Sequence, residues 1–150
     1  MTNFNSVNDI LDFAIKNEQE AQKFYAELAA VATRSGSKEL FESFVMEEKR
    51  HEEKLKAVKE GKAIASAEGK VTDLKISDYV VDAPATPDMD FQKSLILAMK
   101  KEKAAFMLYT NLSKRVEGEL KDIFLALAQE EAKHKLYFET EYDEHVLTDN

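Results

Sequence analysis

The chain has 150 residues, with no cysteine, no tryptophan, four glycines and two prolines. This length suits one domain over residues 1–150 with a core that needs no crosslinks, and the lack of cysteine excludes a disulfide framework, a zinc–thiolate site and thiol redox chemistry. The 29 acidic and 21 basic side chains give a net charge of −8, which argues against nucleic acid or an anionic membrane surface as a partner.

Long helices are the expected secondary structure, because glycine and proline are scarce while alanine, glutamate, lysine and leucine are abundant. The first helix is expected to start near Ser6, whose hydroxyl can cap it, and to run to about Thr33. Gly36 then breaks the pattern. Ser37 can cap a second helix, which is expected to end at Gly61.

The second half of the chain predicts two more helices. The third is expected from Asp88 to about Val116, and Gly118 separates it from a fourth over roughly residues 119–145. Short turns make consecutive helices antiparallel neighbours, whereas the stretch 61–87 is long enough to cross a bundle. The predicted fold class is therefore all-α, a ferritin-like four-helix bundle of two antiparallel helix hairpins joined by a long crossover connection.

An internal repeat relates the two predicted hairpins. A shift of 84 residues places six residues of the first helix on identical residues of the third, namely Ala14, Lys16, Glu18, Ala21, Tyr25 and Leu28 on Ala98, Lys100, Glu102, Ala105, Tyr109 and Leu112. A shift of 83 residues relates the second and fourth helices in the same way, with Phe41, Glu47, Glu48 and His51 matching Phe124, Glu130, Glu131 and His134. Two homologous hairpins related by a pseudo-two-fold axis explain both shifts.

Each predicted helix places one carboxylate within its apolar stripe, and two helices add an imidazole one turn later. The residues at these positions are Glu18, Glu48, His51, Glu102, Glu131 and His134. Four carboxylates in an apolar interior would repel one another, and each would lose several kcal/mol of hydration unless it were paired or bound to metal. Two divalent cations would cancel the four negative charges.

The spacing within the second and fourth helices suits metal binding. A Glu-x-x-His pair puts both ligands on one helical face, within reach of a shared ion. Six ligands for two ions leave open positions, which is typical of a reactive site. Glu47 is the rival of Glu48, but it lies roughly 100° around the helix and precedes Arg50 rather than His51 by three residues. The other glutamates of these segments are expected to be solvated surface charges, namely Glu20, Glu52, Glu53 and Glu130.

Two segments resemble the rubrerythrin family. They are Ala-Ile-Lys-Asn-Glu-Gln-Glu-Ala-Gln-Lys-Phe-Tyr over residues 14–25 and Glu-Glu-Lys-Arg-His over residues 47–51, together with their repeat counterparts. The resemblance covers about residues 6–145 and keeps all six ligand positions in the family's order. It implies a di-iron centre, for which manganese or zinc can substitute, with Glu48 and Glu131 bridging the metals. It also implies that Tyr25 and Tyr109 hydrogen-bond to ligand carboxylates and supply protons or electrons.

The function that the resemblance implies is a non-haem di-iron oxidoreductase that reduces peroxide or O2. Without cysteine the chain cannot form the rubredoxin domain of full-length rubrerythrins, so electrons have to come from an external donor, a rubredoxin-like or other small redox protein. Ala105 stands where full-length rubrerythrins carry an additional glutamate associated with peroxidase activity, so the resemblance supports metal binding more directly than efficient peroxide reduction. It also implies a homodimer.

Two other functions fit the same sequence. A ferroxidase or iron-handling protein would use the same ligands and assemble into a hollow shell. A metal-free helical interaction module would have a melting temperature that chelators do not change. No transmembrane span and no secretory signal are visible, so a cytoplasmic protein without a membrane partner is expected. His145 has no carboxylate at a matching spacing and is expected to be exposed.

Overall fold

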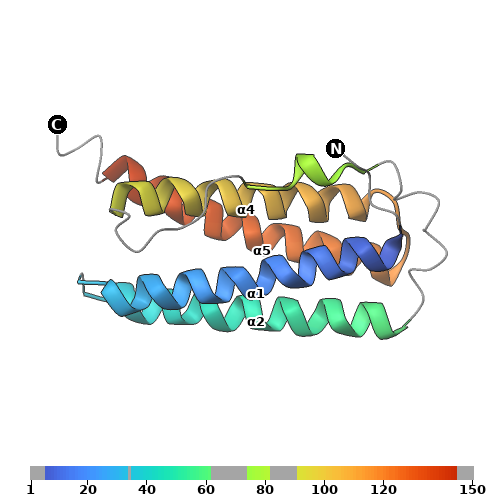
Figure 1. Cartoon of the computed structure of the whole chain (residues 1–150), viewed down its shortest axis with the longest axis horizontal. Coiled ribbons are helices and arrows are strands. Elements are labelled where there is room, and N and C mark those ends of the chain that lie inside the picture. The colour runs from blue at the N-terminus through green and yellow to red at the C-terminus, as the bar shows by residue number, and fades with distance from the viewer. Residues whose placement is uncertain (1–5, 34, 62–73, 82–90, 145–150) are drawn as a thin grey trace. The chain divides into compact units, whose positions relative to one another are not determined.

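The computed structural model describes residues 6–33, 35–61, 74–81 and 91–144. Within these ranges the chain forms four α-helices and one short 3-10 helix (Figure 1). In chain order they are α1 (Val7–Val31), α2 (Ser37–Gly61), η2 (Ile76–Asp78), α4 (Phe91–Ser113) and α5 (Glu119–Tyr142). The all-α fold class is confirmed. No helix among the described residues is both long enough and apolar enough to cross a bilayer.

The helices pack in two antiparallel hairpins, α1 with α2 and α4 with α5 (Figure 1). By its backbone packing the chain divides into two compact units that follow these pairs. The first hairpin belongs to the unit Phe4–Asp73, and the second belongs to the unit that contains Leu74–Asn150. The pairing of consecutive helices is therefore as the sequence predicts. The assignment of residues 1–150 to one domain stays a prediction.

The ends of the first hairpin's helices follow from local chemistry. The Ser6 hydroxyl accepts a hydrogen bond from the backbone N–H of Asp9 at 3.1 Å, which confirms the predicted cap. Ser37 is not the cap of α2 but its first residue. Gly36 precedes it with φ +83°, a left-handed backbone conformation that glycine adopts without steric cost. The Gly36 carbonyl accepts a hydrogen bond from the backbone N–H of Leu40.

Apolar residues at helical spacing form the interior of this hairpin. Those that are buried on α1 include Ile10, Leu11, Ala14, Tyr25 and Leu28. Those that are buried on α2 are Phe41, Phe44, Leu55 and Val58. The chain leaves α1 at Val31, slightly before the predicted end near Thr33. Glu18, Glu48 and His51 share the same buried faces.

The second hairpin is bounded in a similar way. The predicted start of α4 at Asp88 lies outside the described residues, and α4 ends at Ser113, three residues before the predicted Val116. The Ser113 hydroxyl donates to the Thr110 carbonyl at 2.6 Å in this last turn. Gly118, with φ +65°, precedes α5, so the predicted break is confirmed.

The segment 74–81 packs against α4. Its Tyr79 is buried, and the Tyr79 hydroxyl accepts a hydrogen bond from Asn111 Nδ2 at 2.8 Å. Apart from Gly61 at the end of α2, this segment is the described part of the predicted crossover over residues 61–87. The rest of that crossover lies outside the described residues, and so does His145.

Candidate metal centre

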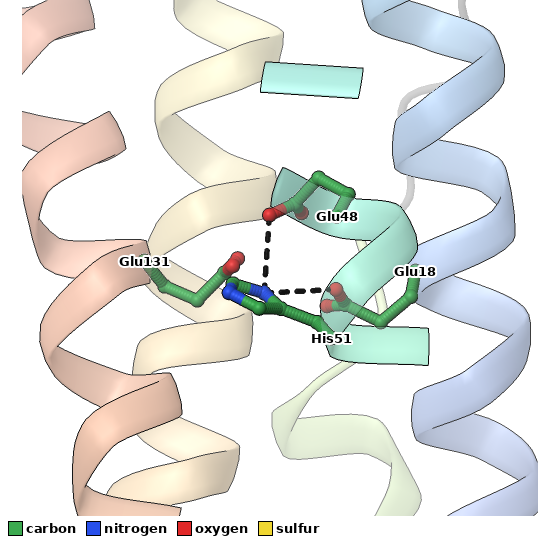
Figure 2. Close-up of side chains that lie close together, drawn as sticks. All are labelled: Glu18, Glu48, His51 and Glu131. Atoms are coloured by element: carbon green, nitrogen blue, oxygen red, sulfur yellow. Dashed lines mark ion pairs between the residues drawn. The ribbon is translucent and has the colours of Figure 1, made fainter. Parts of the chain in front are cut away.

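The first hairpin brings together Glu18 from α1 with Glu48 and His51 from α2 (Figure 2). We call these three residues the first ligand set. His51 Nδ1 lies 3.1 Å from Glu18 Oε2 and 3.2 Å from Glu48 Oε1. One ligand atom from each residue lies within 4.8 Å of the ligand atoms of the other two. A single metal ion therefore has three potential donors within reach in one helix pair.

Helical periodicity produces this convergence on α2. Phe44, Glu48, His51 and Leu55 follow one another at intervals of three or four residues, so they lie along one face of the helix. All four side chains are buried. The ligands therefore sit between apolar layers that keep water away from them, which strengthens any charge interaction at the site.

The two neighbouring carboxylates decide the protonation state of His51 in the metal-free protein. Burial alone would lower the pKa of His51 from 6.5, because it disfavours a charged imidazolium. Hydrogen bonds and charge attraction from Glu18 and Glu48 outweigh burial and raise the pKa of His51 to about 11. Below that pH the imidazolium offsets one of the two carboxylates. A metal ion that binds the ring nitrogen therefore has to displace a proton.

The second hairpin repeats the arrangement with Glu102 from α4 and with Glu131 and His134 from α5. We call these three residues the second ligand set. His134 Nδ1 lies 3.5 Å from Glu102 Oε1, and one ligand atom of each residue lies within 4.8 Å of those of the other two. The six side chains of the two sets are between 1% and 4% exposed. The sequence repeat thus has a structural counterpart in each hairpin.

The structure also separates the predicted ligands from their sequence neighbours. Glu48 and Glu131 are buried, whereas Glu47 and Glu130 are only partly so. A step of one residue turns the side chain by roughly 100° around the helix, which moves it from the buried face toward the side. This difference favours Glu48 over its rival Glu47. The assignment of the six residues as metal ligands, and of Glu48 and Glu131 as bridges, stays a prediction.

The donor atoms suit a first-row divalent metal. Carboxylate oxygen and imidazole nitrogen together are typical ligands of iron, manganese and zinc. Each set supplies two carboxylates, which would balance the charge of one divalent cation once the imidazole is neutral. The buried carboxylate and imidazole side chains are compatible with a metal centre, and they leave the identity of the metal open.

The two tyrosines singled out in the sequence are both buried. The ring of Tyr25 meets Phe44 edge-on, with centroids 5.7 Å apart. Tyr109 stacks on Phe124, with centroids 6.4 Å apart and an angle of 16° between the rings. Each tyrosine is thus held within the interior of its own hairpin. Their predicted part in proton or electron supply stays a prediction.

Glu52 is a residue whose role the sequence analysis missed. Its carboxylate accepts hydrogen bonds from Gln19 Nε2 and Gln22 Nε2 of α1, each at 2.8 Å, and it lies 2.8 Å from Lys56 Nζ. Lys56 and the two amides lower the pKa of Glu52 from 4.5 to about 2. The expectation of a simply solvated charge is therefore wrong for Glu52. We call these four residues the Glu52 cluster.

The Glu52 cluster connects the two helix turns that carry the first ligand set. Gln19 directly follows Glu18 in the chain, and Glu52 directly follows His51. The bond between Gln19 and Glu52 therefore limits sliding of α1 along α2 at the level of the ligands. The spacing of Gln19 and Gln22 on one face of α1 was the sequence signal that could have indicated a shared acceptor on a neighbouring helix.

Comparisons with known proteins agree with this arrangement. The family model described as Rubrerythrin matches residues 9–83 and 93–149. A solved structure of a hypothetical protein from Pyrococcus furiosus is 27% identical in sequence and superposes with a TM-score of 0.70, covering 90% of this chain and 87% of that one. No curated protein matches the chain. The family resemblance inferred from the sequence is confirmed.

Proposed function

Because the chain belongs to the rubrerythrin family, we propose that it is a non-haem di-iron oxidoreductase that reduces peroxide or O2 with electrons from an external donor. The observation that carries the proposal is the buried Glu, Glu and His set in each hairpin. Each set would hold one iron ion, which makes two irons per chain. Manganese or zinc would compete for the same donors.

The metal pair, when bound, supplies open coordination positions and the two electrons that, with two protons, convert hydrogen peroxide to two molecules of water. The protein's own residues prepare the site. Glu18 and Glu48 hold a proton on His51 until metal replaces it, and the apolar layers around them exclude water. Tyr25 and Tyr109 are proposed to supply protons or electrons at their respective hairpins.

The surroundings of the reaction are also part of the proposal. These 150 residues contain no cysteine that could bind iron through a thiolate, and we propose that a rubredoxin-like or other small redox protein supplies the electrons. We propose a cytoplasmic homodimer. Ala105, which replaces the additional glutamate of full-length rubrerythrins, makes the rate of peroxide reduction the quantity to measure first.

Two measurements test the proposal. Elemental analysis of protein purified without added metal should give about two iron ions per chain, one for each ligand set. Stopped-flow mixing of the ferrous protein with peroxide should then show rapid oxidation that a Glu48→Ala, His51→Ala double variant loses. The matched control is Glu47→Ala with Arg50→Ala, which alters the same helix at positions that are not buried. Equal oxidation rates in wild type and in the Glu48, His51 variant would refute the proposal.

The same samples separate the two other functions. Ferric iron released as a mineral inside a large shell, seen by light scattering, would identify iron handling rather than peroxide reduction. A melting temperature that does not change with a chelator would identify a metal-free interaction module, since bound metal stabilises a folded state by mass action.

A further inference from the structure

The exposed charge of α4 has the opposite sign to that of the whole protein. The net charge of the chain is −8, yet the only acidic residue of α4 is Glu102, which is buried. The remaining charged residues of α4 are lysines, namely Lys93, Lys100, Lys101 and Lys103. On α1, α2 and α5, by contrast, acidic and basic side chains are interspersed outside the ligand positions. The outer side of α4 is therefore a local positive region.

An open groove lies beside these lysines, between α4 and the segment 74–81. Its volume is about 300 Å³. Its lining is mainly apolar, from Val80, Val81, Ala104 and Met107. Val80 and Met107 are large apolar side chains that stay 43% and 37% exposed. The charged lining residues are Lys100, Lys103 and Asp78, so positive charge predominates around an apolar surface.

The groove is held in shape by its own unit. Leu74 and Tyr79 anchor the segment 74–81 by burying their side chains, and Asn111 of α4 donates a hydrogen bond to the Tyr79 hydroxyl. Val80, directly after this anchor, is left exposed. A partner would therefore meet a preformed surface and would not have to order this segment first, which lowers the free-energy cost of binding.

We propose that this groove, rimmed by Lys100 and Lys103, is the docking surface for a small acidic electron-carrier protein. An apolar centre whose rim carries more positive than negative charge steers a negatively charged partner and sets its orientation. Weak redox encounters bury comparatively little area, which suits a groove of this size. We name it the α4 groove. The inference rests on the proposed function, because it assigns the partner of the same site.

The position of the α4 groove relative to Glu102 favours an electron carrier over other acidic proteins. Glu102 lies between Lys101 and Lys103 in the chain, and its carboxylate belongs to the second ligand set. A helix with its side chains is only about 10–12 Å across, so a protein docked on the outer side of α4 lies within about one helix diameter of that carboxylate.

The internal repeat supplies a natural comparison on α1. The 84-residue shift relates Lys16, Gln19, Glu20 and Lys23 to Lys100, Lys103, Ala104 and Met107. Glu20 and Lys23 thus replace the two apolar α4 residues of the groove with charged ones. Lys16 and Lys23 are exposed, and so are Lys100 and Lys103. A pair of charge reversals at Lys16 and Lys23 therefore changes the net charge by the same amount without altering the α4 groove.

The test measures binding of zinc-substituted acidic rubredoxin, labelled with a dye, to the protein as purified, by fluorescence anisotropy. We expect a Lys100→Glu, Lys103→Glu variant to weaken binding by about tenfold or more, while Lys16→Glu with Lys23→Glu changes it by about twofold or less. A Lys100→Gln, Lys103→Gln variant should weaken binding to an intermediate extent, and it provides the result if the reversed variant fails to fold. Raising the salt concentration should reduce the difference between the variants.

Carbodiimide crosslinking followed by peptide mass spectrometry locates the contact. Crosslinks from rubredoxin carboxylates to Lys100 or Lys103 are the expected result. Three results would each overturn the inference. The first is an equal loss of binding in the charge-reversed variants of α4 and α1. The others are crosslinks confined to other lysines, and crosslinks at Lys103 that join two copies of this chain. Both readouts are independent of turnover. Docking without reduction of either peroxide or O2 would refute the proposed function alone. Reduction of peroxide or O2 without docking at this groove would refute the inference alone.

Discussion

Replacing Glu52 with alanine tests how the first hairpin keeps its ligands in register. The variant removes a carboxylate that accepts hydrogen bonds from Gln19 and Gln22 on the neighbouring helix, each at 2.8 Å. Because Gln19 follows Glu18 and Glu52 follows His51, the bonds lost include one between the residues next in the chain to two members of the first ligand set. Both helices are expected to form without them, but with less resistance to relative sliding.

The expected loss follows from the exposure of each contact. Hydrogen bonds to a charged acceptor contribute about 1.5–3 kcal/mol each when buried, and solvent screening at this partly exposed position reduces that figure. Lys56 is 53% exposed, so its ion pair with Glu52 adds about 0.5 kcal/mol or less. We expect Glu52→Ala to lower the free energy of unfolding of the metal-free protein by about 2 kcal/mol.

The effect of Glu52→Ala should depend on pH with a definite sign. Lys56, Gln19 and Gln22 hold the pKa of Glu52 at about 2, below its ordinary value of 4.5. A carboxylate whose pKa is lower in the folded state stabilises the protein above pH 4.5, and this contribution is lost as the pH falls from 4.5 toward 2. The difference between wild type and variant should therefore be full at neutral pH and should close in acid.

Urea unfolding of the metal-free protein, followed by circular dichroism, measures this difference. The matched control is Glu53→Ala, the exposed neighbour, which should change the free energy of unfolding by about 0.5 kcal/mol or less. Glu52→Gln should fall between the two, because its amide oxygen can still accept one of the interhelical bonds. If Glu52→Ala and Glu53→Ala unfold at the same urea concentration, the interhelical bonds of Glu52 do not stabilise the hairpin and the reasoning is wrong.

Four further outcomes are expected. Since the pKa of His51 is about 11, binding of Mn²⁺ to the first ligand set should release a proton and strengthen by up to about tenfold per pH unit between about pH 6 and 8; calorimetry in two buffers would show no proton release if this is wrong. Chelation of bound metal should lower the melting temperature, and an unchanged value would contradict metal binding. Leu55→Ala, at a fully buried position, should cost about 2–5 kcal/mol in urea unfolding, and a loss below about 1 kcal/mol would contradict its place in the core. Tyr79→Phe should cost about 1 kcal/mol through the lost bond to Asn111, and unchanged thermal unfolding would contradict that bond's contribution.

Helical periodicity and the repeat made much of this protein predictable from its residues. Glu48 and His51 recur at the spacing of Phe44 and Leu55, so any helix that buries the apolar residues must bury the polar ones with them. The same periodicity places Glu48 on the buried face of the helix and turns Glu47 away from it. The helix breaks at Gly36 and Gly118 depend on the backbone freedom of glycine, which is a property of one residue and needs no tertiary contact.

Contacts between elements needed the tertiary structure. The bonds of Glu52 to Gln19 and Gln22, and the raised pKa of His51, depend on the rotation and axial offset of α1 against α2, which periodicity within either helix leaves undetermined. The α4 groove likewise depends on where Tyr79 anchors the segment 74–81 against α4. Local spacing decides which face of a helix is buried, and packing between helices decides which polar groups on their edges meet.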